Sequence, residues 1–536
     1  MSSSTTKEYT PQKGLPKKTE SICPECGKIL VAEYYDKEGK VYAKKTCPEH
    51  GEFDSLIWSD TEIYLRSEKF ATDGIGLINP KRDGEDNVHI KIDGRRVDMH
   101  SSTSLANIDL TNRCNMNCPI CFANANQAGY VYEPSYDEIV AMMQVLRNEE
   151  PIKCTAVQFS GGEPTIHPDF VRVIAKAKEL RFAQIQVATN GLVFAKNPEV
   201  LKAAVEAGLN TVYLSFDGVS DDVYVQARDR KMFNVKLKVL ENIRQLEHKP
   251  SVVLVPTIVK GVNDHQIGDI VKFAFDNADI VRGVNFQPVA FTGRITKEEL
   301  EKGRFTLPDL VNSVNEQTGY TTKDDWYPVP VVAPISKFAS ILMGDRKITF
   351  TTHPHCGLAT YLFKDENDNV IPLPRFIDVE KFVLGLDKLA NKADKSRFKK
   401  YYIFKAYRLM NKCIYDDKVP EGLSKKTFLK VMGNIMSKKS KKTLAVFSWK
   451  MMFIGGMHFQ DSYNYDIERV ERCAIHYVTP DLRVIPFCAF NSGPEYRKEV
   501  EAKFSVPLAE WKEKNKAEAK ALEEAMIVPD DQKPDV

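Results

Sequence analysis

Three cysteines stand in one short loop, Cys114, Cys118 and Cys121, directly after an apolar run. The C-x3-C-x2-C spacing brings three thiolates together, and a [4Fe–4S] cluster held by three cysteines keeps one iron without a protein ligand. An open coordination position of this kind distinguishes a catalytic metal site from a structural one. The alternatives are a structural zinc site, which takes four ligands as two separated pairs, and three unrelated core cysteines. We therefore predict a [4Fe–4S] cluster that binds a substrate or cofactor.

A second motif, Gly161-Gly162-Glu163, follows downstream in the segment Val157–Thr165. The glycines allow the backbone to approach a ligand closely, and the glutamate offers a negative charge to an ammonium group. With the cysteine loop, this motif resembles the radical S-adenosylmethionine (SAM) enzymes. The resemblance implies that the turn binds the SAM amino group. It also implies that a cluster electron cleaves SAM and that the resulting 5′-deoxyadenosyl radical abstracts hydrogen from an unactivated C–H bond.

Apolar runs of strand length alternate with helical patterns between residues 105 and 287. Six strands with intervening helices predict an α/β fold with a parallel barrel. The resemblance implies a partial (β/α)6 barrel with its chemistry at the carboxyl ends of the strands. It also makes four polar residues candidates for binding the SAM ribose, carboxylate and adenine, although each alone is more often a turn residue: Asn190, Ser215, Asp217 and Asn263. The predicted strands are Leu105–Leu110, the run from Val157, Gln184–Ala188, Val212–Phe216, Val252–Thr257 and Val284–Gln287, and the predicted helices are Tyr136–Arg147, Asp169–Leu180, Glu199–Ala207, Asn234–Leu246 and Gln266–Asp276.

Two short knuckles near the N-terminus, Cys23/Cys26 and Cys47/His50, flank a predicted hairpin around Asp36–Gly39. Two knuckles at this separation are typical of a zinc-ribbon or rubredoxin-like site. Four ligands leave no open position, so a structural role is favoured, and a redox role is the alternative if iron fills the site. His50 is included as the fourth ligand on spacing alone.

Four more cysteines follow the predicted barrel, and two of them, Cys473 and Cys488, flank a predicted hairpin with a Pro-Asp turn. This arrangement resembles the auxiliary-cluster domains of radical SAM enzymes. It predicts a second [4Fe–4S] cluster, with buried structural cysteines as the alternative. The predicted ligands are Cys356, Cys473 and Cys488, and the fourth is Cys413, His355 or a substrate.

The net charge and the cysteine content indicate which partners and which cellular compartment to expect. Lys and Arg number 75 against 73 Asp and Glu, so the overall charge indicates no nucleic-acid partner and we predict none. Eleven cysteines without a signal peptide indicate metal ligation in a reducing cytoplasm. Cys154 is predicted to pack as a small apolar side chain in the second barrel strand.

Residues 395–442 hold 15 Lys and Arg but only 3 Asp and Glu, interleaved with aromatic and aliphatic residues. Such a basic amphipathic pattern suits an anionic membrane surface. The apolar run Leu444–Phe459 is too short to span a membrane and would instead line an apolar channel. A solvated basic helix pair on an ordinary hydrophobic core is the alternative.

The full motif series resembles the archaeal tetraether lipid synthases, from Cys-Pro-Glu-Cys at Cys23 through Thr-His-Pro-His-Cys-Gly at Cys356 to Pro-Phe-Cys at Cys488. The resemblance implies carbon–carbon bond formation between isoprenoid ether lipid chains and a peripheral position at the inner face of the membrane. We also expect an electron donor such as ferredoxin or flavodoxin. Residues 74–101 contain no cysteine, whereas that family carries a cysteine-rich loop there that holds another cluster, so we expect that cluster to be missing. If it carries out the carbon–carbon coupling, the resemblance implies a related but different reaction.

Two other functions remain open. One is radical SAM modification of a peptide or a pterin-like small molecule, for which a small polar pocket is expected in place of a lipid-sized apolar tunnel. The other is a non-catalytic iron–sulfur electron-transfer protein, which would not need the turn at Gly161–Glu163. The predicted organisation is a disordered tail (1–20), a metal module (21–75), a radical SAM barrel (100–320), an auxiliary-cluster and lipid-facing region (321–500) and a charged tail (501–536).

Overall fold

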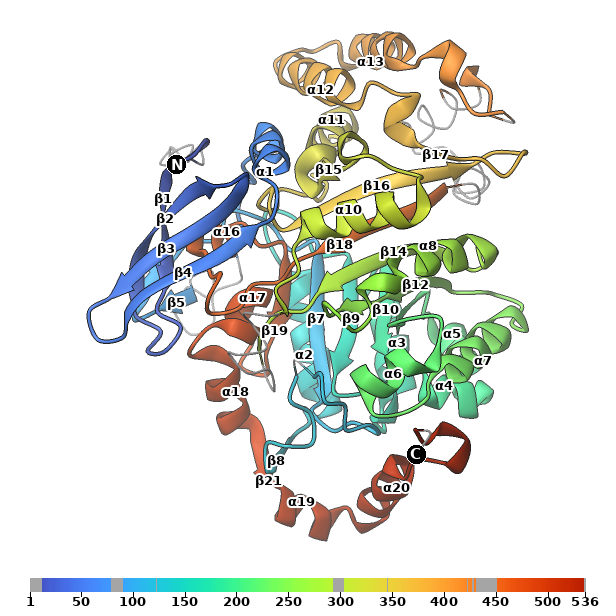
Figure 1. The fold of residues 1–536 in the computed structure, drawn as a ribbon. Coiled ribbons are helices and arrows are strands. Elements are labelled where there is room, and N and C mark those ends of the chain that lie inside the picture. The colour runs from blue at the N-terminus through green and yellow to red at the C-terminus, as the bar shows by residue number, and fades with distance from the viewer. Residues whose placement is uncertain are drawn as a thin grey trace.

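The fold is built around one sheet of thirteen strands (Figure 1). We describe a computed structural model, which covers residues 12–78, 90–121, 123–292, 303–344, 346–421, 423–426, 429 and 451–534. Six parallel strands form the centre of the sheet, and their Val, Ile, Leu and Phe side chains suit strands that are covered on both faces. All six lie where the apolar runs predicted them, which confirms the mixed α/β fold. They are β7 (Leu105–Thr111), β9 (Ala156–Gly161), β10 (Gln184–Thr189), β11 (Thr211–Ser215), β12 (Ser251–Val255) and β14 (Val281–Pro288).

Helices connect these strands and cover the outer face of the barrel. In α2, buried residues recur at spacings of three and four from Ile139 to Leu146, which sets one apolar stripe against the sheet. Ser135 begins this helix with a capping box, because its hydroxyl accepts from the Glu138 amide while the Glu138 carboxylate accepts from the Ser135 amide. The helices of this layer are α2 (Tyr136–Arg147), α3 (Phe170–Glu179), α4 (Leu192–Lys196), α5 (Pro198–Ala207), α6 (Asp221–Arg228), α7 (Phe233–Arg244), α8 (Ile267–Asp276) and α10 (Leu307–Thr318).

The sheet continues beyond the six strands on both sides. β18 pairs in parallel with β14, and β16 pairs antiparallel with β18. On the other side β19 pairs in parallel with β7, and β19 and β20 form the hairpin that was predicted between Cys473 and Cys488. The described part of the apolar run Leu444–Phe459 is therefore an interior strand. The added strands are β13 (Thr257–Ile258), β15 (Tyr327–Pro328), β16 (Gly357–Lys364), β17 (Val370–Pro372), β18 (Met451–Met457), β19 (Ile475–Val478) and β20 (Val484–Pro486).

The N-terminal module is a four-stranded antiparallel sheet followed by a short helix. Glu38 and Gly39 both adopt positive φ, at 54° and 75°, and close the predicted hairpin between β2 and β3. The prediction of a disordered tail over residues 1–20 is wrong for its last part, because Lys17–Ile22 forms β1 and pairs with β2. Residues 1–11 lie outside the described residues. The elements are β1 (Lys17–Ile22), β2 (Ile29–Lys37), β3 (Lys40–Cys47), β4 (Gly51–Trp58) and α1 (Thr61–Ser67).

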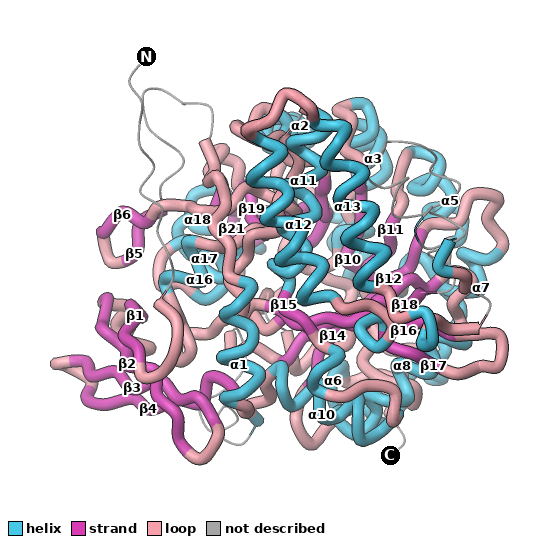
Figure 2. The backbone as a smooth tube through the Cα atoms, turned by 90° about the horizontal axis from the view of Figure 1, so that it is seen from above, coloured by secondary structure: helices cyan, strands magenta, loops and turns pink. Residues whose placement is uncertain are grey.

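Three helices, α11 (Ala333–Met343), α12 (Val379–Asp394) and α13 (Lys399–Cys413), pack against one another beside β16 and enclose a second core (Figures 1 and 2). α13 is the long helix within the described part of the basic stretch, and its inner face buries Ala406 and Met410. This matches the alternative interpretation of a basic helix on an ordinary core; residues 430–450 lie outside the described ones. Within the part of the chain that is described, no helix has the length and apolar content to cross a membrane.

The C-terminal segment runs along one side of the barrel and ends beneath it (Figure 1). It carries the loop with Cys473, the β19–β20 hairpin and a series of short helices. A small ribbon, β21, pairs with β8 next to the barrel, which ties the segment to the region that follows the cysteine loop. The remaining elements are β5 (Ile90–Ile92), β6 (Arg95–Val97), β8 (Tyr130–Tyr132), α16 (Ile467–Glu471), α17 (Phe487–Ser492), α18 (Tyr496–Phe504), β21 (Ser505–Pro507), α19 (Leu508–Lys514) and α20 (Lys516–Met526).

Candidate active site

The cysteine loop leaves the carboxyl end of β7 and lines a large cavity. Cys114 is buried, while Cys118 and Cys121 are partly exposed, and all three face this cavity. The side chain of Asn126 holds the loop: its Oδ1 accepts from the Cys114 amide at 2.9 Å, and its Nδ2 donates to the carbonyls of Cys114 and Met116 at 2.8 and 3.0 Å. The structure thus places the three predicted cluster ligands on one wall of a cavity.

The two glycines of the Gly-Gly-Glu turn are required by contact with the backbone that leads into this loop. A Cβ at Gly161 would lie 2.2 Å from the Thr111 carbonyl, and one at Gly162 would lie 2.2 Å from the Arg113 carbonyl. Gly161 also has φ +128°, which other residues rarely adopt. The amides of Gly162 and Glu163 donate to those carbonyls at 2.7 and 2.9 Å. The glycines were predicted to let the backbone approach a ligand closely. In the structure they let the turn approach the backbone that leads into the cysteine loop.

Glu163 joins the ends of β9 and β10. Its side chain is 1% exposed, its Oε1 accepts from the Thr189 hydroxyl at 2.7 Å, and its Oε2 accepts from the Asn190 amide at 2.8 Å. Burial raises the pKa of this carboxyl, and the hydrogen bonds from Thr165, Asn190 and Thr189 oppose that shift. Its predicted contact with the SAM amino group stays a prediction.

Of the four other residues predicted to contact SAM, two line the cavity and two are buried away from it. Asn190 and Ser215 line the cavity, and Asn190 Nδ2 donates to Asn115 Oδ1 at 2.8 Å. Asp217 and Asn263 are fully buried and lie outside the cavity lining. Asn263 Nδ2 donates to the carbonyls of Asp217 and Thr257 at 2.9 and 2.8 Å, so it fixes the turns after β11 and β12. The first two remain candidates for SAM binding, whereas the structure gives the second two an internal role.

Two of the basic residues that line the cavity, Arg228 and Lys236, belong to no sequence motif and were not predicted. Arg228 donates to both carboxylate oxygens of Asp217 at 2.8 Å and to the Ile120 carbonyl at 2.9 Å, so it ties the cysteine loop to β11. Lys236 donates to the Asn190 carbonyl at 2.6 Å, and burial lowers its pKa to about 8. The available signal for Lys236 was a lysine on the mostly apolar inner face of α7.

Helix α20 covers the cysteine loop. Its Glu518 carboxylate lies 3.4 Å from Arg113 Nη2, and Met526 Sδ accepts from Asn126 Nδ2 at 3.7 Å. The guanidinium of Arg113 also lies 4.4 Å from the Trp511 ring of α19. The stretch that was predicted as a charged tail therefore packs against the loop.

The C-terminal cysteines form a second group. Burial raises the pKa of Cys488 to about 11 and that of Cys473 further, and the neighbouring thiols add to the shift. The guanidinium of Arg469 interacts with Cys356 and Cys488. The structure thus brings the three predicted auxiliary ligands near one another, with Cys488 buried and Cys356 and Cys473 partly exposed. Cluster binding there stays a prediction.

Neither protein candidate for the fourth auxiliary ligand belongs to this group. Cys413 ends α13 and is buried in the separate core of the helical layer. His355 stacks on the Tyr64 ring at 3.6 Å, and its Nε2 lies 3.0 Å from the Tyr64 carbonyl. Both side chains fill interfaces between elements, which explains their burial without a metal.

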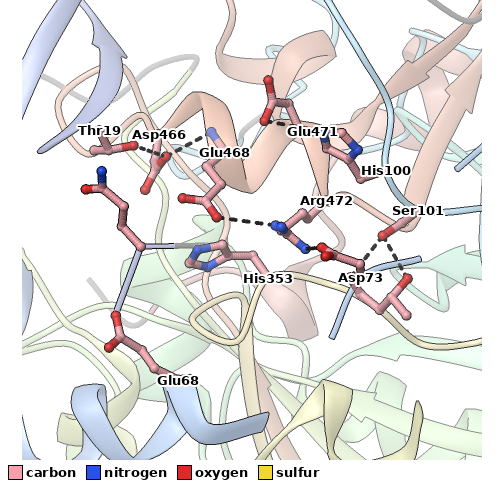
Figure 3. Close-up of polar contacts among 12 residues, drawn as sticks. Thr19, Glu68, Asp73, His100, Ser101, His353, Asp466, Glu468, Glu471 and Arg472 are labelled. Atoms are coloured by element: carbon pink, nitrogen blue, oxygen red, sulfur yellow. Dashed lines mark hydrogen bonds and ion pairs between the residues drawn. The ribbon is translucent and has the colours of Figure 1, made fainter. Parts of the chain in front are cut away.

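A buried charge network fixes the helix that leads to Cys473 (Figure 3). Arg472 is 1% exposed and pairs with Asp73 at 2.5 Å and with Glu468 at 3.3 Å. Asp466 begins α16 and accepts from the Thr19 hydroxyl of β1 at 3.0 Å. α16 is therefore anchored to the N-terminal module on one side and to residue 73 on the other.

This network predicts a pH dependence. Burial, followed by the charge of Asp466, raises the pKa of Glu468 to about 7 in the folded protein. Because the folded state then holds the proton more tightly than the unfolded chain, stability falls as the pH rises from about 4.5 to about 7. Glu468→Gln removes this contribution, which is at most about 3 kcal/mol. Melting temperatures across this range should therefore fall less steeply for the variant, and parallel curves would contradict the assignment.

The N-terminal ligands form a compact metal centre. One ligand atom from each of Cys23, Cys26, Cys47 and His50 lies within 4.8 Å of all the others. The Sγ atoms of Cys26 and Cys47 are 3.9 Å apart, and Cys47 Sγ lies 3.5 Å from His50 Nδ1. Three thiols and one imidazole are a donor set that suits tetrahedral zinc. The structure thus assembles the four residues that the spacing predicted.

Loss of one of these ligands should release the metal and unfold the module, because a structural metal contributes folding free energy directly. We expect Cys47→Ser to lower bound metal by about one ion per chain and to expose residues 15–59 to protease. Metal analysis and limited proteolysis measure both effects. Cys413→Ser, at a buried cysteine outside the centre, is the control and should keep the metal; full retention in Cys47→Ser would contradict the assignment.

Family models match both parts of the chain. One, described as the radical SAM superfamily, covers residues 108–274, and the other, described as the HMPTM N-terminal zinc ribbon domain, covers residues 15–59. The first spans the cysteine loop and the Gly-Gly-Glu turn, and the second spans the four-ligand metal centre. Fold and site therefore define the class as a radical SAM enzyme with an N-terminal zinc ribbon, and this class uses a [4Fe–4S] cluster and SAM.

Among curated proteins, the chain is 45% identical over 504 residues to the 7,8-dihydro-6-hydroxymethylpterin dimethyltransferase of Methanocaldococcus jannaschii, over 94% of this chain and 98% of that protein. The chain belongs to the family of that protein, within the radical SAM superfamily. A GTP 3′,8-cyclase of Clostridium acetobutylicum is 26% identical over 222 residues, which are 40% of this chain and 66% of the cyclase. Among solved structures, Streptococcus suis SuiB bound to S-adenosylmethionine is 18% identical, covers 41% of this chain and 44% of its own, and has a TM-score of 0.30.

These comparisons correct two predictions. The likeness to tetraether lipid synthases is not supported, because the relative that spans 94% of the chain is named for a pterin. The predicted partners, an isoprenoid ether lipid and a membrane surface, are wrong for the same reason. The physical cause lies in the C-terminal region, where β18 is apolar as an interior strand and α13 rests on a core.

Proposed function

We propose that this protein is a radical SAM enzyme that methylates a pterin-like small molecule. The observation that carries the proposal is the 45% identity over nearly the full length of the chain to a relative named for that activity. The cavity has a volume of about 1370 Å³, above the roughly 300–1,000 Å³ of common ligand pockets, which leaves room for SAM and a second molecule.

The residues present fit the cofactors of the class. Cys114, Cys118 and Cys121 would hold the cluster, since they offer three thiols on the wall of a cavity and no fourth protein ligand is needed. When bound, the cluster and SAM supply the one-electron chemistry that breaks an unactivated C–H bond. The chain itself positions the site. Arg228 holds the loop, Glu163 holds the Gly-Gly-Glu turn beside it, and α20 packs against the loop.

The cavity differs from the small polar pocket expected for a pterin-modifying enzyme. One wall is polar and consists of barrel side chains, whereas another is apolar and comes from α11, β16 and β18, with Ile335, Leu358 and Phe453 among its residues. The polar wall lies on the same strands that carry the cysteine loop and the Gly-Gly-Glu turn. The substrate ring belongs on this side because the cofactor residues are here.

The test is anaerobic turnover. Protein with reconstituted clusters is mixed with SAM, a reductant and 6-hydroxymethyl-7,8-dihydropterin. The products are separated by chromatography, and their masses are measured by mass spectrometry. We expect a pterin heavier by one or two methyl groups. For each methyl group, one SAM yields methionine and 5′-deoxyadenosine, which carries away the substrate hydrogen, a second SAM gives the methyl group and leaves as S-adenosylhomocysteine, and the reductant supplies two electrons. If SAM is cleaved but the pterin is neither bound nor changed, the assignment of a pterin substrate is wrong, while the assignment as a radical SAM enzyme still holds.

A further inference from the structure

A line of side-chain amides crosses the inner wall of the barrel. Gln184 Nε2 donates to Gln186 Oε1 at 2.8 Å, Gln186 donates to Gln158 Oε1, and Gln158 Nε2 donates to Asn107 Oδ1 at 2.8 Å. Asn107 pairs with Gln158 and Gln158 with Gln186 in the strand register, so the three stand side by side on β7, β9 and β10. All four line the cavity. We call them the amide belt.

A related group stands on two further strands of the same barrel. Asn285 and Gln287 of β14 both donate to the Tyr213 hydroxyl of β11, Gln287 at 3.2 Å. These three side chains also line the cavity. Amide groups therefore face the cavity from four of the six central strands.

Burying the amide belt costs free energy unless a polar ligand forms hydrogen bonds with it. Asn107, Gln158 and Gln186 are only 1%, 9% and 4% exposed. A side-chain amide carries two N–H donors and an oxygen that accepts twice, and the bonds along the belt use one N–H from each glutamine. Buried polar groups with unused capacity cost free energy, and barrels that only need to be filled use branched apolar residues. The belt therefore indicates a ligand with its own donors and acceptors.

The belt suits the edge of a flat heterocycle. The pyrimidinone ring of a pterin presents an oxo acceptor, an N–H donor and an amino donor in one row. A carboxamide pairs with such an edge through two hydrogen bonds, as Asn and Gln do with adenine. We propose that the amide belt binds the pyrimidinone edge of the substrate, an inference that rests on the proposed function and identifies its recognition site.

The position of the belt fits this role. Gln158 precedes Gly161 by three residues on β9, which is about 10 Å along a strand. A ring held at its pyrimidinone edge by the belt therefore extends toward the Gly-Gly-Glu turn. Its far side, which carries the substituent carbons, then points toward the cysteine loop, where the cofactors bind. The belt fixes which side of the ring is presented for reaction.

The test measures binding, separately from turnover. The affinity of cluster-loaded protein with SAM for 6-hydroxymethyl-7,8-dihydropterin is determined by equilibrium dialysis for wild type and for the double variant Gln158→Leu/Gln186→Leu. We expect the variant to bind the pterin at least about tenfold more weakly, with SAM affinity and iron content within about twofold of wild type. Gln158→Glu, nearly identical in shape, removes the N–H donors with little change in packing and should also weaken binding. Gln144→Glu, exposed on α2, is the matched control.

A second probe tests the edge itself. A lumazine carries an oxo group in place of the 2-amino group, so wild type should prefer the pterin and the belt variants should lose that preference. If wild type binds and converts the pterin but the belt variants bind it equally well, the inference about the belt is wrong and the proposed function stands. If wild type binds no pterin, the proposed function fails first and the inference with it.

Discussion

Replacing Cys118 with alanine should empty the cluster site and abolish SAM cleavage. Three thiolates are the protein's whole contribution to a cluster with an open iron, and the three that face the cavity here are Cys114, Cys118 and Cys121. Loss of an outer-shell partner already costs about 10–100-fold in metal affinity or activity, so loss of a ligand should cost more than about a hundredfold. Iron and sulfide analysis after reconstitution, with assay of 5′-deoxyadenosine, measures both effects.

The control is a cysteine outside the site. Cys154 is fully buried beside β9, and its Sγ donates to the Ala156 carbonyl at 3.2 Å. Cys154→Ala removes a thiol of the same barrel without touching the cavity, so it should retain the iron of the cluster. Wild-type iron and wild-type SAM cleavage in Cys118→Ala would show that the cluster is held elsewhere.

The barrel could be predicted from the sequence because its signals are local. Each central strand is a short apolar run, and each helix shows one apolar face. The predicted helix Tyr136–Arg147 agrees with α2 at both ends, since Ser135 and Glu138 mark its start by their own chemistry. The four N-terminal ligands could be predicted for the same reason, because their spacing alone fixes two knuckles.

The described part of the apolar run Leu444–Phe459 lines the apolar wall of the cavity, as predicted, but its assignment to a lipid was wrong because burial in a sheet and contact with a lipid select the same residues. Its described part is β18, which is covered by its neighbours β14 and β16. Cys413 shows a related limit. It has the residue type of a ligand, but its helix carries it into another core. Cysteine spacing cannot predict such a position when the ligands come from separate elements.

The polar parts of the site were missed because they are assembled across strands. Gln158 and Gln186 are ordinary alternating strand residues in the sequence, and only the parallel register of β9 and β10 makes them neighbours. Arg228 was missed for the same reason, because it ends α6, whereas Asp217, which was predicted in a different role, follows β11. Motifs predicted the cofactors, whereas the residues that shape the substrate site depended on the fold.

Arg228→Met should destabilise the cysteine loop strongly, because it leaves Asp217 buried without its partner. Asp217 is fully buried and the Arg228 side chain is 15% exposed, and the guanidinium meets both carboxylate oxygens. Breaking a buried pair from one side costs about 3–5 kcal/mol. The variant also loses the bond from Arg228 to the Ile120 carbonyl. We therefore expect a lower melting temperature and incomplete cluster loading after reconstitution.

An exposed pair of the same geometry isolates the effect of burial. Arg244 donates to both oxygens of Asp279 at 2.7 and 2.8 Å, but the two side chains are 36% and 47% exposed. Exposed pairs contribute about 0–1 kcal/mol, so Arg244→Met should keep the wild-type melting temperature and full iron content. If the two variants lose melting temperature and iron equally, the Arg228 guanidinium contributes no more than an exposed charge does. The proposed role of Arg228 in holding the cysteine loop would then be wrong. If only Arg228→Met loses melting temperature and iron, the stability of the turn after β11 and the binding of the cluster are coupled through Arg228.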